Sequence, residues 1–581
     1  LGDRTGIADT LYNIAVTERD RNNYQAAQKQ IESAIAIIED IRTNVTSQDL
    51  RSSYFASIQK YYQFYIDLLM RLHKQHPDKG YDALALQVSE RDRARSLVEL
   101  LNEANADIRQ GVDPKLLELE RNLQQKLDAT EKRQIQLSNK PNTEAQSQAL
   151  QKEISALLEQ NRQLKAQIRS SSPRYAALTQ PQSLTLAQQQ QLLDNDTLVL
   201  EYSLGEERSY LWAVSKTNIK SYELPKRAEI ETIAKQFNGL LKRDNYRLDS
   251  TISTSVVSTP GSLPDVEVAS KLSQMLLQPV AKELGNKRLV IVSDGALQYL
   301  PFAALPNPKN QTGKTQSTPL LVDHEIVNLP SVSTLAVLRK EVNNRQRAPK
   351  AIAILADPVF TSDDPRLKSP QQKLDKPNVN ELDLSRSAKR TGVKFDRLPF
   401  TRTEGDRIST LFPDGSRKEV FDFDASRAIA TSPELSQYRI VHFATHGILN
   451  STQPELSGIV LSLFDNKGMP QNGFLRLNDI FNLHLPAELI VLSACETGLG
   501  KEIKGEGLVG LTRGFMYAGS PRVVVSLWSV NDEATSELMT KFYQKMLQDK
   551  LKPAAALRSA QIEMLKNDKF AAPYYWAAFT L

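Results

Sequence analysis

The spacing of apolar residues changes along the chain and divides it into four stretches. Residues 1–110 and 111–175 have helical spacing, 185–285 begins with strand-like alternation, and 286–581 alternates apolar strands with amphipathic helices. A length of 581 residues fits several units of ~100–200 residues each. We therefore predict four units with these boundaries.

The first stretch is predicted to be helical repeats. Leu11, Ile14 and Ala15 share one helix face, a short DRNN turn follows at 20–23, and Tyr24 and Ala27 begin a second face. Small residues where helices cross, and an aromatic residue just after the turn, resemble a tetratricopeptide repeat. A looser copy has longer connections and ends in ERDRARSLVELL (90–101), so an ordinary helical bundle remains the alternative.

The second stretch is predicted to be an antiparallel coiled-coil hairpin. Two runs of leucine and isoleucine at three- and four-residue steps lie on either side of NKPNT (139–143), where Pro141 ends a helix. Thr130, Gln134 and Asn161 interrupt the apolar seam. With only about three heptads in each arm, pairing between copies of the chain is an alternative that would give an oligomer.

The third stretch opens with β-rich segments at 197–205, 208–215 and 219–225, which predict a meander. The fourth contains runs of valine, isoleucine and leucine that predict parallel strands buried on both faces of an α/β sheet. These runs lie at 288–294, 351–357, 438–444, 489–494 and 522–528. Ligands of open α/β sheets bind beyond the carboxyl ends of the strands, where Asp294, His446 and Cys495 are expected.

Composition narrows the classes of protein. Hydrophobic residues make up 40% of the chain and charged residues 24%, with 73 basic against 68 acidic side chains. The net charge of +5 is too small to indicate nucleic acid or an anionic membrane as a required partner. One cysteine excludes an intrachain disulfide framework, and no apolar run or leader pattern predicts a membrane span or export, so a cytoplasmic protein is expected. Because the chain opens with Leu1, it is expected to be a piece of a longer protein.

That single cysteine, Cys495, and His446 end two similar strands. LIVLSACETG (489–498) and VHFATHG (441–447) each run from a buried strand into a glycine-containing turn. A histidine within hydrogen-bond reach can activate a thiol and later protonate a leaving amine. The backbone N–H groups of Gly447 and Cys495 are then the candidate oxyanion donors.

Each residue also has an ordinary structural interpretation, the cysteine as a small buried apolar group and the histidine as a hydrogen-bonded strand end. The combination favours chemistry. Both residues lie at strand ends beside glycines, and the separation of 49 residues (495 minus 446) is close to the ~50 typical of histidine before cysteine in caspases.

These motifs resemble the CHAT family of caspase-like peptidases of clan CD, which often follow tetratricopeptide repeats. The resemblance is carried by VHFATHG, LIVLSACETGLG and GEGLVGLTRGFMYAGSPRVVVSLWSVND, and the earlier IVSDGALQYLPFAAL and LPFTRTEGDRISTLF keep the family's order. It implies a multidomain chain in which helical repeats and a coiled coil precede an α/β caspase-like domain at 286–581. That domain would have a mostly parallel sheet in three layers, with a degenerate pseudo-caspase-like half at 185–285.

The resemblance also implies residue roles. His446, which directly precedes glycine, would be the general base and acid, and Cys495 the nucleophile that forms an acyl-enzyme. His442 would support the site from within the strand. No acid at fixed spacing marks a third member, so we expect a dyad whose imidazole is held by a backbone carbonyl or another nearby group.

Substrate preference depends on the pocket. Clan relatives with acidic pockets cleave after Arg or Lys, whereas caspases use arginines to accept Asp. The pocket residues expected here are Asp294, Ser493, Ser526, Trp528 and Asp532. Asp294 could instead be an ordinary turn residue in SDG (293–295). Arg513 and Arg522 leave cleavage after Asp as an alternative. We predict cleavage after a basic residue.

Rival chemistry fits the sequence less well. HFATH spaces two histidines by four, but in a strand and without the glutamate of zincins, and GLGKEIKGEGLVG (498–510) has no phosphate-binding loop pattern. No metal or other cofactor is therefore expected. The serious alternative is a non-catalytic or partner-gated signalling or scaffold protein that acts through its repeats and coiled coil. In either case the repeats are predicted to recruit a protein substrate or regulator, because they present long binding faces.

Overall fold

The structure is a computed structural model of the 581-residue chain. It describes residues 4–43, 48–93, 97–98, 101, 112–138, 144–171, 183–248, 266–310, 318–343, 345–367, 395–449, 456–494, 500–503 and 507–581. Within these ranges, each helix is too short or too polar to cross a bilayer.

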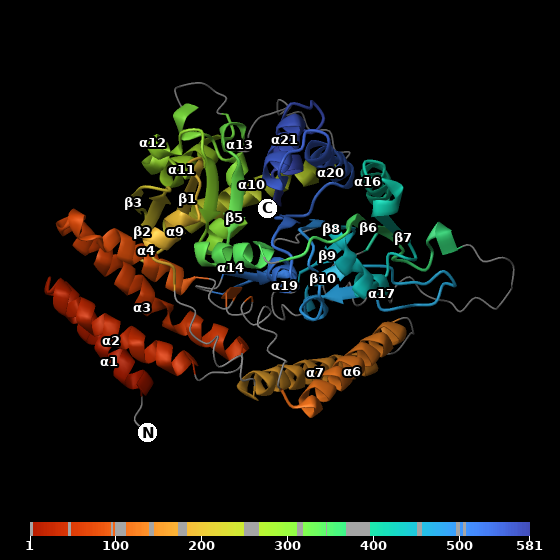
Figure 1. The fold of residues 1–581 in the computed structure, drawn as a ribbon, viewed down its shortest axis with the longest axis horizontal. Helices are drawn as coiled ribbons and strands as arrows, with labels where there is room; N and C mark the ends of the chain where they lie inside the picture. The colour runs from red at the N-terminus through yellow and green to blue at the C-terminus, as the bar shows by residue number, and fades with distance from the viewer. Residues whose placement is uncertain are drawn as a thin grey trace.

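The chain begins with paired helices, which confirms the helical repeats predicted from the sequence (Figure 1). They are α1 (Arg4–Asp20), α2 (Tyr24–Thr43), α3 (Gln48–Gln75) and α4 (Tyr81–Asp92). Ala8, Ala15, Ala27 and Ala34 are fully buried, so small side chains lie inside this packing. Close approach of the helix backbones therefore explains the alanines of the repeat pattern.

A first sheet follows, with five strands among the described residues in the order β3-β2-β1-β4-β5. They are β1 (Thr197–Ser203), β2 (Ser209–Val214), β3 (Ile219–Leu224), β4 (Arg288–Val292) and β5 (Ile326–Leu329). The predicted meander β1-β2-β3 is present and antiparallel, whereas β4 and β5 are parallel to β1. Helices α10 (Arg227–Leu248) and α11 (Val266–Leu276) share a core with this sheet.

The helical repeats cover the opposite face of the first sheet. Tyr62 and Leu86 of the helices share one core with Val199, Trp212 and Val290 of the strands. The repeats are thus a layer of the α/β structure and not a separate arm, because the apolar faces of α3 and α4 are buried against strands.

One strand expected in the later sheet lies in the first. Val199 of β1 pairs in parallel with Val290 of β4, so the run at 288–294 joins the meander instead of the strands that carry His446. The prediction for this strand was wrong because its pairing partner is about ninety residues away in sequence, and apolar periodicity does not specify partners.

The second sheet has six described strands in the order β16-β15-β12-β8-β6-β7. They are β6 (Lys350–Pro358), β7 (Arg417–Asp422), β8 (Tyr438–Ala444), β12 (Leu489–Ser493), β15 (Val523–Ser526) and β16 (Phe579–Thr580). Every neighbouring pair is parallel except β15-β16. Successive side chains face opposite cores, and this confirms the mostly parallel three-layer arrangement.

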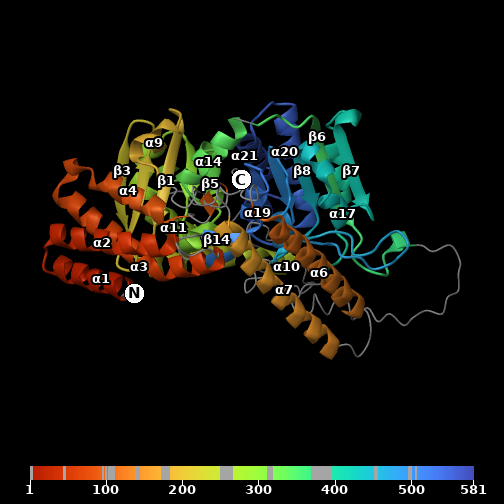
Figure 2. The same cartoon turned by 60° about the horizontal axis from the view of Figure 1, so that its bottom comes forward.

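Helices cover both faces of the second sheet (Figures 1 and 2). On one face lie α16 (Pro399–Ser409), α20 (Asp532–Leu547) and α21 (Pro553–Leu565), and on the other α17 (Arg427–Ala430), α18 (Leu477–Ile480) and α19 (Leu511–Tyr517). The two sheets meet edge to edge, where the backbone N–H of Asn328 in β5 donates to the carbonyl of Leu581 just after β16 over 2.9 Å.

Helices α6 (Pro114–Ser138) and α7 (Glu144–Ser171) lie side by side below the second sheet (Figures 1 and 2). Leu123, Leu127, Ile154 and Leu157 form their shared core. Polar contacts attach the pair to α18: Asn478 Nδ2 donates to Gln124 Oε1 over 3.2 Å, and Lys165 Nζ donates to Asn478 Oδ1 over 3.3 Å. Pairing between copies of the chain stays a prediction.

Candidate active site

His446 lies just beyond the carboxyl end of β8. The chain passes through Thr445 into β9 (His446–Ile448), which pairs with β10 (Gly458–Val460) in a small second layer of strands. The N–H of Thr445 donates to the carbonyl of Ser493 over 3.2 Å, and its hydroxyl donates to the carbonyl of Val460. The turn that carries His446 is therefore tied to the end of β12.

The parallel register of β8 and β12 pairs Ala444 with Ser493. His446 and Cys495 each come two residues after this pair in the sequence. Cys495 itself lies outside the described residues, and so does Gly498. The last described residue before them is the buried Ala494, whose carbonyl accepts a hydrogen bond from the hydroxyl of Ser526 in β15.

The imidazole of His446 is held by a backbone carbonyl, one of the two kinds of group predicted for this role. Its Nε2 lies 2.7 Å from the carbonyl oxygen of Asp396, which can only accept, so Nε2 carries the proton and donates. Nδ1 is then the unprotonated nitrogen. Phe360 and Phe395 enclose the ring, with centroids 4.9 and 5.5 Å from it.

This environment favours a neutral histidine. Burial lowers the pKa of His446 below its ordinary value of 6.5, and the Asp396 carbonyl only partly opposes the shift. A neutral imidazole with one free nitrogen can accept a proton near neutral pH. Gly447 lies opposite Ile459 in β9-β10, and its proposed contact with an oxyanion stays a prediction.

The segment 396–400 also reaches Asp532, the first residue of α20. The backbone N–H of Phe400 donates to Asp532 Oδ2 over 2.9 Å. Burial raises the pKa of Asp532 to about 6; the Phe400 N–H opposes this shift, and the negative charges of Glu404 and Asp357 add to it. One five-residue segment thus contacts both His446 and a half-buried carboxyl group.

Asp294 does not belong to this site, which corrects the prediction. It follows β4 in the first sheet, where its Oδ2 accepts hydrogen bonds from Arg227 at 3.0 Å and from the N–H of Leu204 at 2.8 Å. Strand β4 belongs to the first sheet, whereas β8, which leads into His446, is in the second.

The other predicted pocket residues have different places. Trp528 is buried, and its indole N–H donates to the carbonyl of Tyr574 over 3.1 Å, so it packs in the core. Ser526 holds Ala494, as described above. The buried hydroxyl of Ser493 has no hydrogen-bond partner within the described ranges.

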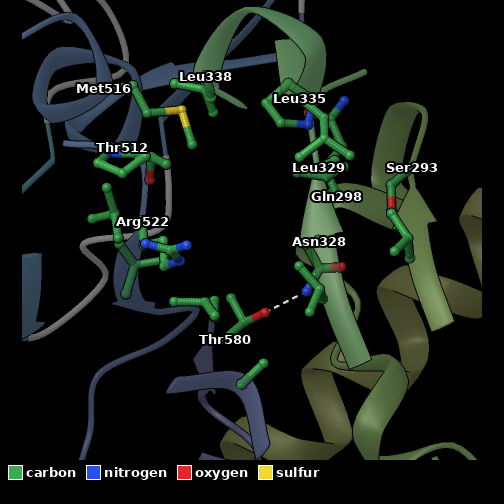
Figure 3. A pocket seen from close by; sticks show the side chains of 18 of the residues that line it. Ser293, Gln298, Asn328, Leu329, Leu335, Leu338, Thr512, Met516, Arg522 and Thr580 are labelled. Atoms are coloured by element: carbon green, nitrogen blue, oxygen red, sulfur yellow. Dashed lines mark hydrogen bonds between the residues drawn. The ribbon is translucent and has the colours of Figure 1, made fainter. Parts of the chain in front are cut away.

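A cavity of about 600 Å³ lies where the two sheets meet (Figure 3). Helix α14 (Val332–Asn343) contributes Leu335 and Leu338, and α19 contributes Thr512 and Met516. This cavity is lined by Arg513 and Arg522, the two arginines that could have indicated cleavage after Asp. His446, Asp396 and Asp532 are not among its lining residues. The large cavity and the His446 site are therefore separate.

His442 lies in the core beneath the site. Its Nε2 donates to Glu404 Oε1 over 2.8 Å, and the hydroxyl of Tyr543 is 3.1 Å from its Nδ1. All three side chains are fully buried. Because His442 and His446 have different partners, they do not converge on a shared ligand, and the described residues contain no group of three acidic, histidine or cysteine side chains suited to a metal.

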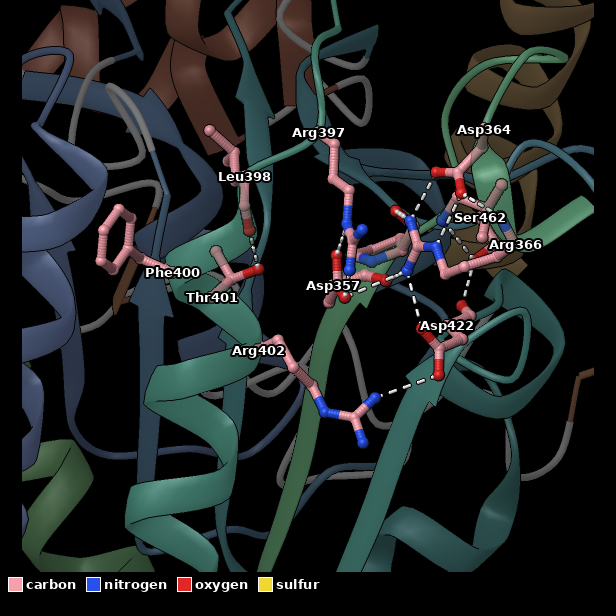
Figure 4. Close-up of polar contacts among 12 residues, drawn as sticks. Asp357, Asp364, Arg366, Arg397, Leu398, Phe400, Thr401, Arg402, Asp422 and Ser462 are labelled. Carbon is pink, nitrogen blue, oxygen red and sulfur yellow. Dashed lines mark hydrogen bonds and ion pairs between the residues drawn. The ribbon is translucent and has the colours of Figure 1, made fainter.

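Sequence reasoning missed the charged residues around Asp396 (Figure 4). Arg397 bonds Asp357 at the end of β6, and Arg366 bonds Asp357, Asp364 and Asp422. The sequence contained one indication of this cluster: Asp357 is an acidic residue near the carboxyl end of a buried strand, a position similar to that of His446. Arg366 and Arg397 could not be identified from the sequence pattern, because they lie outside the strands and α-helices.

Comparison with protein families settles where the chain belongs. The model of the CHAT domain matches residues 266–581, more than half of the chain. The chain belongs to the CHAT domain family. The matched region begins at α11, so the CHAT region includes β4 and β5 of the first sheet as well as the whole second sheet.

Two curated proteins are similar to about half of the chain. Human tetratricopeptide repeat protein 28 is 25% identical over 331 residues, and the mouse protein of that name is 24% identical over 336 residues. Each match covers 51% of this chain and 12% of the relative, so the chain spans only about an eighth of their length.

Among solved structures, two crystal structures of the Saccharomyces cerevisiae separase-securin complex are similar at a TM-score of 0.36 and 9% identity. Those matches cover all of this chain and 47% of the other.

Proposed function

We propose that this chain is a cysteine endopeptidase in which His446 activates Cys495. The observation that carries the proposal is the bond from His446 Nε2 to the Asp396 carbonyl, which leaves Nδ1 as the basic nitrogen. The register of β8 and β12 supports the pairing, because it aligns Ala444 with Ser493, two residues before each member of the dyad. Membership of the CHAT family agrees with this reaction class.

The reaction follows from these positions. Nδ1 of His446 takes the proton of the Cys495 thiol, and the thiolate attacks the carbonyl carbon of the scissile peptide bond. The backbone N–H groups of Gly447 and Cys495 stabilise the negative oxygen of the tetrahedral intermediate. When the C–N bond breaks, the imidazolium returns its proton to the leaving amine. Water then hydrolyses the thioester, with His446 again as the base.

Cleavage after arginine or lysine is the preference we propose, with Asp532 as the acid of the pocket. Asp532 contacts the same segment 396–400 as His446, and its Oδ2 accepts from the Phe400 N–H. A partly buried carboxylate pairs favourably with a guanidinium or ammonium group. Asp294 is excluded from this role because Arg227 already binds it in the other sheet.

The test uses the full chain and two peptide reporters that differ only in Arg or Asp before the cleaved bond. Turnover of the Arg reporter should fall ~10²–10⁴-fold in Cys495→Ala and His446→Ala. His442→Ala is unsuitable as a control because it unpairs the buried Glu404, so His484→Ala, on the described surface loop, is the matched variant. Turnover by Cys495→Ala equal to that of the parent chain would end the proposal.

A second candidate function is a partner-gated scaffold. The observation that favours it is the polar attachment of α6 and α7 to α18 through Gln124, Lys165 and Asn478. Polar contacts exchange readily with water, so a partner that binds these helices could shift them against the strands that carry His446. Asn478→Ala should then alter the basal rate, whereas Gln163→Ala, which removes only a bond to Glu159 within α7, should not.

A further inference from the structure

We propose that Asp357 and Arg397 are positioning residues of this site: their ion pair fixes the peptide whose carbonyl orients His446. The inference rests on the proposed role of His446 as the base. Neither residue touches a substrate in this proposal. Both act through the Asp396 carbonyl, and the function assigned to them is to keep the proton on Nε2 of the imidazole.

The connection is covalent and short. The carbonyl of Asp396 and the nitrogen of Arg397 belong to one planar peptide unit, so a constraint on Arg397 limits how that carbonyl can turn. The Arg397 side chain makes two parallel bonds to Asp357, from Nε to Oδ1 at 2.9 Å and from Nη2 to Oδ2 at 2.7 Å. A two-pronged guanidinium–carboxylate pair fixes orientation as well as distance.

Asp357 is itself held in place. It lies within β6 near the carboxyl end, is 1% exposed, and has a left-handed backbone with φ of +49°, which a residue other than glycine adopts only when its surroundings demand it. Arg366 Nη1 donates to the Asp357 carbonyl at 2.7 Å and lies 3.0 Å from Oδ2. The anchor of Arg397 is thus part of the sheet.

Further ion pairs fix Arg366 (Figure 4). It bonds Asp364 Oδ2 at 2.7 Å and Asp422 Oδ1 at 2.7 Å, and Asp422 is the last residue of strand β7. Buried charges of opposite sign are stable only when each has partners. The cluster therefore links the ends of β6 and β7 to the segment that orients His446.

Orientation matters because the two nitrogens of a neutral imidazole have opposite roles. The Asp396 carbonyl accepts from Nε2–H and so keeps Nδ1 free to accept the thiol proton. If the carbonyl turns away, the ring can rotate or carry its proton on Nδ1. Misplacement by about 1 Å at a reacting group can lower a rate on the order of 10²-fold.

Arg402 supplies a matched control within the same cluster. Its side chain is 40% exposed against 39% for Arg397, and it also bonds a carboxylate of the cluster, with Nη1 3.0 Å from Asp422 Oδ2. Arg402 lies in α16, away from the Asp396 peptide, and its other ion pair is with Asp406 in the same helix. Replacing Arg402 should therefore change the charge of the cluster without releasing the Asp396 carbonyl.

The experiment uses the fact that the chain has one cysteine. Iodoacetamide then reports the reactivity of Cys495 alone, and its rate is measured from pH 5 to 9 on the full chain with Arg397→Met, Arg397→Lys, Arg402→Met and His446→Ala. In His446→Ala the midpoint of the rate profile should rise toward the ~8.5 of an ordinary thiol. Arg397→Met should move it the same way and slow alkylation at pH 6.5 on the order of 10-fold.

Arg397→Lys should recover part of the loss, because lysine can still reach one oxygen of Asp357, and Arg402→Met should match the parent chain. If Arg397→Met behaves like Arg402→Met while His446→Ala shifts the profile, the positioning role is wrong and the dyad stands. If His446→Ala itself leaves the profile unchanged, the dyad fails and the positioning role fails with it.

Discussion

His446 donates its Nε2–H to the backbone carbonyl of Asp396 over 2.7 Å, across fifty residues of sequence. The carbonyl supplies what a carboxylate supplies in a catalytic triad, a fixed acceptor that sets the tautomer. The proposed dyad therefore needs no acidic side chain for this role.

Activity should fall on acidification with a midpoint below pH 6.5, the ordinary pKa of histidine. Burial lowers the pKa of His446 from 6.5, so the imidazole stays neutral to lower pH. The measurement is kcat/KM against pH for an Arg reporter without a titratable group near this range. The Asp532→Asn variant is used so that this carboxyl group does not titrate. We expect kcat/KM to reach half of its plateau below pH 6.5. A midpoint above 6.5 would contradict a half-buried ring that stays neutral.

Preference for a basic residue should depend on the ionisation of Asp532. Its pKa of about 6 means that the carboxylate forms as pH rises from 5 to 7, so discrimination between an Arg and a citrulline reporter should increase over that range. In Asp532→Asn the discrimination should be lower and flat with pH. Asp294→Asn is the matched control, because Asp294 lies in the other sheet, and a loss of preference in that variant instead would reverse the assignment.

The buried set of Glu404, His442 and Tyr543 should stabilise the fold. Burial, with the charge of Glu404 adding to it, raises the pKa of Tyr543 well above its usual range, so its hydroxyl keeps its proton and can donate to His442. Tyr543→Phe leaves Nδ1 of His442 without that partner and should lower the free energy of unfolding by ~1–3 kcal/mol.

Urea unfolding measures this change. The control is Tyr24→Phe, which removes an exposed bond to Asn22 and should have little effect. Equal effects of the two substitutions would show that the buried contact contributes nothing of its own.

The contact between the helical repeats and the first sheet should weaken as pH rises. Glu201 is fully buried beside Arg93 and Ser89, and burial, with the nearby Glu90, raises its pKa from 4.5 to about 8. Between these values the folded chain holds a proton that the unfolded chain has released, so stability falls as pH rises through that window. The contribution is on the order of a few kcal/mol.

Glu201→Gln removes this titration and should flatten the decline. The melting temperature of the variant relative to the parent chain should therefore rise between pH 5 and 8.5. A constant difference across that range would mean that Glu201 does not carry a raised pKa, whatever the absolute stability of the variant.

Periodicity predicted most of the local structure. The paired helices at the start bury one face and so repeat apolar residues every 3.6 positions. The meander at 197–225 shows the two-residue alternation of strands, and the strands buried on both faces are continuous apolar runs. The position of His446 beyond β8 followed in the same way. What periodicity does not carry is the partner of each strand, and for that reason β4 and Asp294 were placed in the wrong sheet.

The sequence by itself identified the candidate residues for the proposed chemistry: a lone cysteine and a histidine before glycine, each at the end of an apolar strand. Only the tertiary structure decided which groups hold His446, because the Asp396 carbonyl comes from a loop and the next residue, Arg397, is paired with Asp357 of another strand. It also decided that the helical repeats are a layer of the first sheet. These contacts join segments distant in sequence, and they depend on how faces pack and not on any local pattern.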